Sequence, residues 1–219
     1  MAHDFTELRQ RYLAAQLGGN RREALRLVID EGIGRGASPL EVQLEVIQAA
    51  QREIGRLWEE SAISIAHEHM ATAISNTALA HLYDCSPRAP SNGKKVIVAC
   101  VDGELHDFPA RLVSDALDLA GFDVRYLGAS VPADDIVALI AEERPDLLAL
   151  SVTMELNLPA LRATMERVRA ATKGTLPIAI GGACASRSGI ADELRADATA
   201  SDASETVAAA RRLLGVVAA

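Results

Sequence analysis

The sequence predicts an α/β protein in two parts, a helical bundle followed by a doubly wound parallel sheet. Up to about residue 83, apolar residues recur at three- and four-residue steps, the period of amphipathic helices. After residue 94, short β-branched runs alternate with helical stretches, which indicates parallel strands joined by crossover helices. Between these patterns lies a segment rich in Pro, Ser, Asn and Gly. We therefore expect a bundle over residues 1–84, a linker over 85–93 and an α/β domain over 94–219.

The first part is expected to hold four or five helices. Glycine-containing breaks at residues 18–20 and 32–36 divide the periodic pattern. Ser38, Pro39 and Glu41 have the order of an N-cap, a first-turn proline and a capping glutamate, so a helix should begin there. Helices of this length and number predict a small bundle.

The second part is expected to form a flavodoxin-like (Rossmann-type) sheet with helices on both faces. In such folds the ligand lies beyond the carboxyl ends of the strands, where the winding direction reverses. The loops that follow the strands are therefore the places to search for a site. The expected strands are Val96–Val101, Val124–Leu127, Leu147–Val152, Ile178–Ile180 and a weak fifth at Ala198–Ala200, with a helix expected at Ala133–Glu143 between the second and the third.

Composition excludes several classes of protein. The net charge is −8, and aromatic residues make up only 3%, so neither a basic field nor a stacking platform for nucleic acid is expected. No apolar run is long enough to cross a bilayer, and the first residues lack the order of a signal peptide. Direct nucleic-acid binding and membrane insertion are not expected, and the expected location is cytoplasmic. Three widely spaced cysteines predict neither disulfides nor a zinc site.

The loop after the first expected strand places a carboxylate two residues before a histidine, at Glu104 and His106. The segment Glu104-x-His106-x-x-Pro109 resembles the Asp-x-His-x-x-Gly signature of cobalamin (vitamin B12)-binding domains. The resemblance implies the base-off/His-on mode, in which His106 is the lower axial ligand of cobalt. Glu104 would accept a hydrogen bond from the other ring nitrogen and set the imidazole tautomer. Family members usually have Asp where Glu104 stands and Gly where Pro109 stands.

Two further parts of the cobalamin-domain pattern follow in order, each after a strand. Ser151 and Thr153 follow the third strand, and the resemblance implies that they flank the displaced nucleotide tail of the cofactor. Gly181 and Gly182 follow the fourth, where the resemblance implies close approach of the backbone to that tail. Ser130 and Val131, after the second strand, are candidate contacts of the corrin ring.

A second resemblance lies in the helical part. Trp58, Glu68 and His69 are similar to the Trp-x9-Glu-His motif of CarH-type B12-dependent photoreceptors. It implies adenosylcobalamin, with these three residues above the corrin and His69 as an upper cobalt ligand after light breaks the cobalt–carbon bond. Because the chain begins directly with the expected bundle, the DNA-reading domain of those regulators is not expected. Related sensors called photocobilins also hold a bilin such as biliverdin.

The expected function is therefore a cobalamin-binding photoreceptor or signalling module without catalytic turnover. Its output would be self-association or binding of a partner signalling protein. Two alternatives stay open. One is a corrinoid protein that carries methyl groups for a methyltransferase system, in which the cofactor supplies the chemistry. The other is a B12 chaperone or storage protein.

Plainer interpretations of the same residues also stay open. His106 alone could be a surface-loop histidine, and His69 a hydrogen-bonded core residue. Trp58 could serve only for packing, and the segment after Ser130 could be only a helix start with acidic residues in its first turn. His3, His67 and His81 match no motif and are assigned no role.

Overall fold

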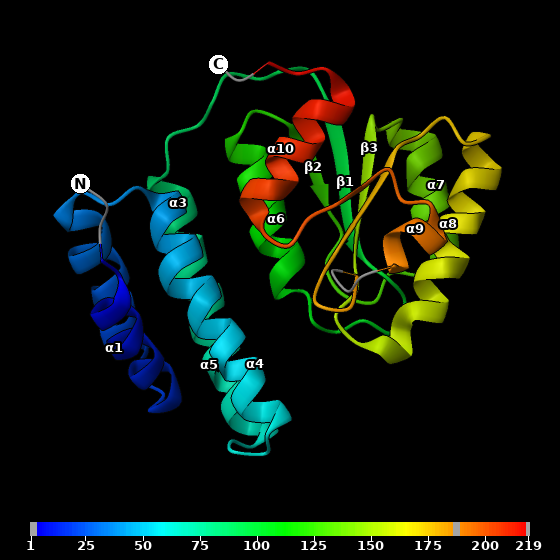
Figure 1. The fold of residues 1–219 in the computed structure, drawn as a ribbon. Coiled ribbons are helices and arrows are strands. Elements are labelled where there is room, and N and C mark those ends of the chain that lie inside the picture. Colours follow the sequence, from blue (N-terminus) through cyan, green and yellow to red (C-terminus); the bar gives the residue numbers. More distant parts are fainter. Residues whose placement is uncertain (1–3, 186–188, 218–219) are drawn as a thin grey trace. The chain divides into compact units, whose positions relative to one another are not determined.

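The computed structural model describes residues 4–185 and 189–217 and divides into two compact units (Figure 1). The units are Met1–Pro87 and Arg88–Ala219. His3 lies outside the described residues. Each unit has buried apolar residues of its own.

The described residues of the first unit form helices joined by short turns and loops. Two of them contain π-helical segments, so that the elements join into four continuous helices, where four or five were expected. The elements are α1 (Thr6–Leu17); α2 (Arg21–Arg26) with η1 (Leu27–Gly32) and η2 (Ile33–Arg35); α3 (Pro39–Val42) with η3 (Gln43–Gln48) and α4 (Ala49–Glu59); and α5 (Ile65–Cys85). The capping box at Ser38 and Glu41 is present as expected.

Polar side chains link the helices inside this unit. Gln16, which is fully buried, donates to Gln51 Oε1 at 2.9 Å and to Ser75 Oγ at 2.8 Å. The hydroxyls of Tyr12 and Ser75 are 3.1 Å apart. Because buried polar groups stabilise a fold only when they are paired, these bonds fix the mutual register of α1, α4 and α5.

The second unit is a five-stranded parallel sheet in the order β2-β1-β3-β4-β5, the flavodoxin-like order that the sequence predicts. Runs of Val, Ile and Leu form its central strands because parallel strands are covered on both faces. The strands are β1 (Lys95–Cys100), β2 (Asp123–Tyr126), β3 (Leu147–Ser151), β4 (Ile178–Gly181) and β5 (Ala198–Thr199).

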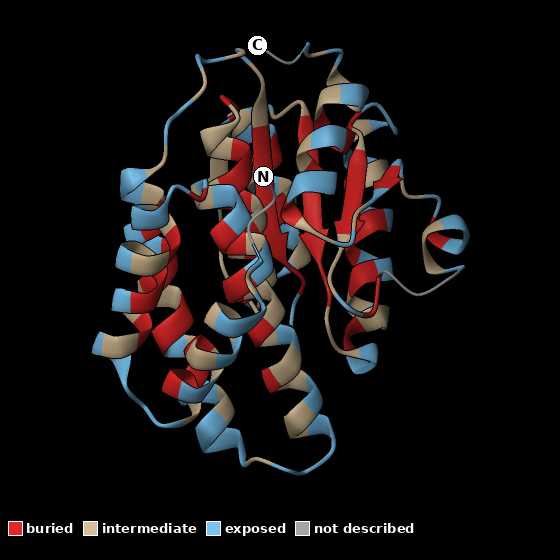
Figure 2. Ribbon diagram, turned by 60° about the vertical axis from the view of Figure 1, so that its left-hand side comes forward, coloured by how far each residue is buried: buried red, intermediate tan, exposed pale blue. Residues whose placement is uncertain are grey.

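Successive residues of β1, β3 and β4 enter different cores, one on each face of the sheet. Ile97, Leu148 and Leu150 belong to one core, and Val96 and Val98 belong to the other. Helices cover both faces (Figure 1), and the inner strands β1, β3 and β4 are mostly buried (Figure 2). On the first face lie α7 (Ala133–Glu143) and α8 (Leu158–Thr172), with α9 (Ile190–Leu194) near them; on the other lie α6 (Phe108–Leu119) and α10 (Ala203–Leu214).

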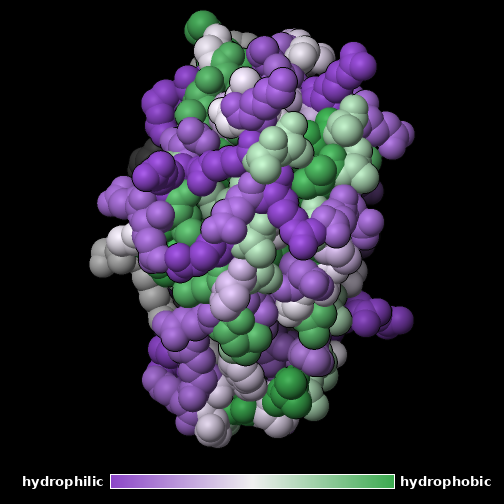
Figure 3. All heavy atoms as spheres, turned by 90° about the vertical axis from the view of Figure 1, so that its right-hand side faces the viewer, coloured by the Kyte–Doolittle hydropathy of each residue, from purple (hydrophilic) through white to green (hydrophobic). Residues whose placement is uncertain are grey.

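The outer faces of the covering helices are mixed in character. Figure 3 shows hydrophilic side chains interspersed with smaller hydrophobic areas over the face that includes α8. This pattern is typical of amphipathic helices whose apolar side faces a sheet. Among the described residues, no helix combines the length and apolar character needed to cross a membrane.

The segment between the two patterns begins one residue later than the sequence predicts. Helix α5 continues to Cys85 and stops because Ser86, which precedes Pro87, takes an extended conformation. Beyond it, Ala89 N donates to Leu119 O and Asn92 N to Gly121 O. The second half of this segment is thereby attached to the turn between α6 and β2.

Candidate cofactor-binding site

Glu104 and His106 lie in the loop after β1. Strand β1 lies between β2 and β3, at the point where the winding of the sheet reverses. Glu104 is fully buried. Its Oε1 accepts hydrogen bonds from His106 Nδ1 at 2.6 Å and from the backbone N of His106 at 2.9 Å. The carboxylate therefore orients both the ring and the backbone of the histidine.

The other carboxylate oxygen of Glu104 binds the loop after β3. It accepts from Thr153 N at 2.9 Å, Met154 N at 3.0 Å and Asn157 Nδ2 at 2.9 Å. The side chain of Glu104 thus joins the loops that follow β1 and β3. The pattern of the first loop indicated Glu104, but neither Met154 nor Asn157 was predicted, because their part depends on how two loops about 50 residues apart pack together.

The charge of Glu104 determines the tautomer of His106. Burial alone would raise the pKa of Glu104, but the hydrogen bonds, led by the one from His106, favour the carboxylate and lower its pKa to about 2. An ionised carboxylate only accepts hydrogen bonds, so Nδ1 of His106 carries the proton and the lone pair lies on Nε2. The side chain of His106 is 39% exposed, which makes its ring accessible to a ligand.

The low pKa of Glu104 predicts a pH-dependent stabilisation. A fall from 4.5 to about 2 corresponds to about 3 kcal/mol, present above pH 4.5 and lost as the pH falls toward 2. Glu104→Gln should therefore lower the free energy of unfolding by that order at pH 7 and by progressively less below pH 4.5, as measured by urea denaturation without cofactor. The control is Glu142→Gln, at an exposed position. Equal losses at pH 7 and pH 3.5 would contradict the charge argument.

Two hydroxyls near Glu104 are buried without a strong hydrogen-bond partner. Thr153 Oγ1 makes no hydrogen bond among the described residues, and Ser151 Oγ faces the thiol of Cys100, a weak partner. Leaving a buried hydroxyl unpaired costs about 1–3 kcal/mol, so such groups call for a polar ligand or a water molecule. The two hydroxyls belong to the residues that the sequence predicts beside a nucleotide tail.

Gly182 is required by the protein backbone itself. Its φ is +93°, and a Cβ there would lie 2.7 Å from Val152 C and 2.9 Å from Val152 N. Gly181 has a more ordinary position, since a Cβ there would lie 3.5 Å from Ala200 O. We expected both glycines to allow the backbone to approach a cofactor. At Gly182 the missing side chain already allows a close approach to Val152, just after β3.

Ser130 and Val131 border the same loop. Ser130 has a φ of +50°, its N donates to Glu104 O at 2.9 Å, and its Oγ accepts from Gly103 N at 3.0 Å. Val131 forms a parallel bridge with Val101. These contacts give both residues a structural role in holding the His106 loop against the segment after β2.

Two large apolar side chains next to the site are exposed. Leu105, adjacent to His106, is 73% exposed, and Leu156, adjacent to Asn157, is 72% exposed. Leucine side chains exposed to this degree beside an oriented imidazole favour a ligand with an apolar surface. Neither leucine was predicted, because nothing in the sequence distinguishes an exposed leucine from a buried one.

The residues predicted above the corrin lie in the helical unit, around the hairpin of α4 and α5. Trp58 is partly buried near the end of α4, and Glu68 and His69 lie in the first turns of α5. The Glu68 carboxylate accepts from Thr72 Oγ1 at 2.8 Å. His69 is 72% exposed and 3.5 Å from Glu68, so its interpretation as a core histidine is wrong.

Comparison with known proteins places this geometry in a family. Residues 94–211 match the B12 binding domain, and residues 8–83 match a second family that is also described as a B12 binding domain. Dimethylamine corrinoid protein 1 of Methanosarcina acetivorans is 29% identical over 197 residues, which cover 89% of this chain and 92% of that protein.

Two further comparisons bear on the fold and on the light-sensor resemblance. The HTH-type transcriptional repressor CarH of Myxococcus xanthus is 28% identical over 158 residues, covering 72% of this chain and 52% of that protein. The solved monomethylamine corrinoid protein of Methanosarcina barkeri has the same fold, with a TM-score of 0.86 at 22% identity, covering 96% of this chain and 100% of that one. With more than half of its length matched, the chain belongs to the B12-binding domain family.

Proposed function

We propose that this chain is a corrinoid protein that carries methyl groups for a methyltransferase system. The observation that carries the proposal is a single imidazole whose Nδ1 is bound by a buried carboxylate at the switch point of a parallel sheet. Methylamine corrinoid proteins are similar to the chain over nearly their whole length, whereas CarH is similar over about half of its length. The comparisons thus support the methyl carrier better than the light sensor that we expected first.

The residues at the strand ends fit a corrinoid. A cobalt held in a corrin would accept an imidazole nitrogen of the protein as a ligand, and we assign this role to Nε2 of His106. The unpaired hydroxyl of Thr153 and the weakly paired hydroxyl of Ser151 would receive polar groups of the cofactor's nucleotide tail. Leu105 and Leu156 would lie against apolar parts of the corrinoid.

The cofactor would supply a cobalt centre that accepts and releases methyl groups. The chain's own residues perform the remaining tasks. Glu104 holds the proton on Nδ1 of His106 and keeps the ring oriented, which strengthens the imidazole as a ligand. Gly181, Gly182, Ser130 and Val131 shape the surrounding loops. Trp58, Glu68 and His69, in the helical unit, remain proposed contacts of the bound cofactor.

The test uses the full chain loaded with methylcobalamin in the dark. We expect the methyl group to reach a thiol acceptor only when a methyltransferase of a methylamine system is added, as measured with a ¹⁴C-labelled methyl group. The control protein lacks the lower ligand, as in His106→Ala. The proposal would be contradicted if the methyl group were transferred at the rate of free methylcobalamin, whether or not the chain and the methyltransferase are present.

Light sensing is the second candidate, favoured by the Trp58, Glu68 and His69 pattern and by the similarity to CarH. The comparisons support neither an adenosyl upper ligand nor a bilin. Loading with adenosylcobalamin and measuring the molar mass by light scattering before and after green illumination separates the two functions. A methyl carrier keeps its mass, whereas a CarH-type sensor changes its assembly.

A further inference from the structure

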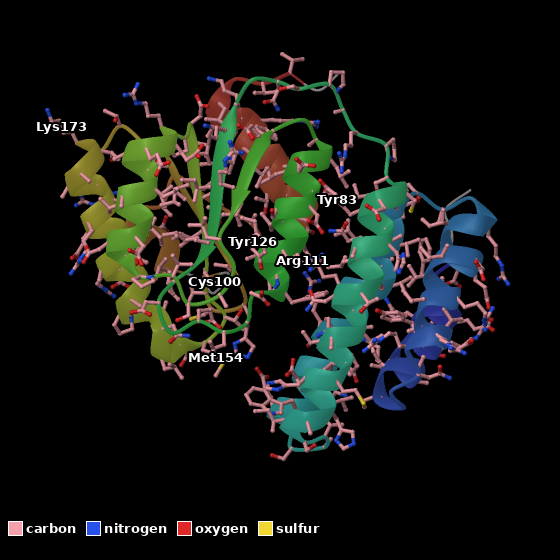
Figure 4. All side chains as sticks on the ribbon, turned by 180° about the vertical axis from the view of Figure 1, so that it is seen from behind. Tyr83, Cys100, Arg111, Tyr126, Met154 and Lys173 are labelled. Atoms are coloured by element: carbon pink, nitrogen blue, oxygen red, sulfur yellow. The ribbon has the colours of Figure 1, made fainter. Side chains whose placement is uncertain are left out.

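The loop that carries His106 has a second anchor, on the side of β2. Tyr126 is the last residue of β2, and its hydroxyl donates to Asp107 Oδ2 at 3.1 Å and lies 3.3 Å from Asp107 O. Asp107 directly follows His106 and is the N-cap residue of α6. Tyr126 lies near Cys100 and Arg111 at this end of the sheet (Figure 4).

The two anchors lie on opposite sides of β1. Glu104 binds the loop after β3, and Asp107 is bound from β2; β1 runs between these two strands. His106 lies in the chain between Glu104, which is bonded to the loop after β3, and Asp107, which is bonded to β2. Its backbone carbonyl is also 3.9 Å from the Cys100 thiol, a weak additional contact. A lateral shift of the imidazole would therefore have to break one of the two anchors.

The Tyr126 hydroxyl is suited to remain a donor. Burial, followed by the charge of Asp107, raises the pKa of Tyr126 well above its usual range, so the phenol is protonated at neutral pH. Its bond to the Asp107 carboxylate is charge-assisted and hence stronger than a bond between neutral groups. Neither the loop motif nor the strand pattern of the sequence indicated this residue.

We propose that Tyr126 is a positioning residue for the cobalt ligand: its hydroxyl holds Asp107 and thereby sets the direction in which Nε2 of His106 meets the corrinoid. This rests on the proposed function only in that a corrinoid is bound with His106 below the cobalt. Tyr126 acts through Asp107 and does not have to touch the cofactor. The conservative change Tyr126→Phe removes the hydroxyl and keeps the ring that packs between the sheet and α6.

The experiment loads the full chain with cobinamide and reduces the cobalt to Co(II). Cobinamide has no nucleotide base, so nitrogen coupling in the electron paramagnetic resonance spectrum comes from a protein imidazole. We expect clear coupling in the wild-type protein. Tyr126→Phe should lower the ratio of His-bound to His-free cobalt about tenfold, the effect of one charge-assisted hydrogen bond.

The matched control is Tyr12→Phe, which removes another tyrosine hydroxyl with a hydrogen bond, in the helical unit, and should keep the wild-type ratio. Asp107→Ala should lower the ratio as Tyr126→Phe does, and the double variant should show no further loss. Equal ratios in wild type and Tyr126→Phe, or additive losses in the double variant, would overturn the role of Tyr126. Absence of nitrogen coupling in the wild-type protein would instead overturn the ligand role of His106 and, with it, this inference.

Discussion

His106→Ala is expected to weaken corrinoid binding about 100-fold or more, because it removes the proposed single bond between the protein and the cobalt. Loss of supporting partners around a metal ligand typically costs 10- to about 100-fold in affinity, and loss of the ligand itself should cost at least the upper value. The measurement is equilibrium dialysis of the full chain against hydroxocobalamin, with the absorption spectrum of the bound fraction as a second readout.

His81→Ala is the matched control for this variant, since His81 is exposed on α5 and matches no motif. Free imidazole should restore part of the His-bound spectrum in His106→Ala, because Glu104 remains to orient a ring at the same place. Unchanged affinity and spectrum in His106→Ala would remove the proposed ligand and the methyl-carrier mechanism with it.

Gly182→Ala is expected to be the most destabilising single-methyl change at the site, at about 3 kcal/mol or more. Alanine at this position would have to adopt a positive φ, which costs a non-glycine residue about 1–2 kcal/mol. Its methyl group would also overlap the backbone of Val152. Backbone cannot rotate away as a flexible side chain can. Urea denaturation of the cofactor-free protein, followed by circular dichroism, measures the loss.

Gly174→Ala separates the two costs of this substitution. Gly174 also has a positive φ, +71°, but a Cβ there would meet nothing within 4 Å, so we expect a loss of only about 1 kcal/mol. If both variants lose the same stability, the contact with Val152 does not explain the glycine. A normal stability of Gly182→Ala combined with weak corrinoid binding would favour a direct role at the cofactor.

The elements of the α/β unit could be predicted closely because each depends on local pattern. The strands begin and end within one residue of the expected positions, and α7 (Ala133–Glu143) has the expected limits. Alternation of apolar runs and helices also indicates crossover connections and hence parallel strands, whereas the order of the strands comes from the structure. The π-helical segments η1 and η3 were not predicted, because a short π-helical segment beside α-helical turns leaves no distinct pattern in the sequence.

Only those residues of the candidate site that belong to one local motif could be predicted from the sequence. Spacing was sufficient to indicate Glu104 and His106, and the hydrogen bond between them is present. Asn157 and Tyr126 could not be found in this way, because each meets the His106 loop only after strands far apart in the sequence pair. The motif likewise indicated a cobalamin without deciding between a methyl carrier and a light sensor.

By itself, the sequence determined the α/β class, the parallel sheet and the histidine with its carboxylate two residues before it. These follow from periodicity and spacing, which act over a few residues. Only the tertiary structure decided that Glu104 is fully buried, that it joins two loops, and that Gly182 meets the backbone of Val152. The physical reason is that burial and hydrogen-bond direction depend on which distant backbone groups arrive at the same edge of the sheet.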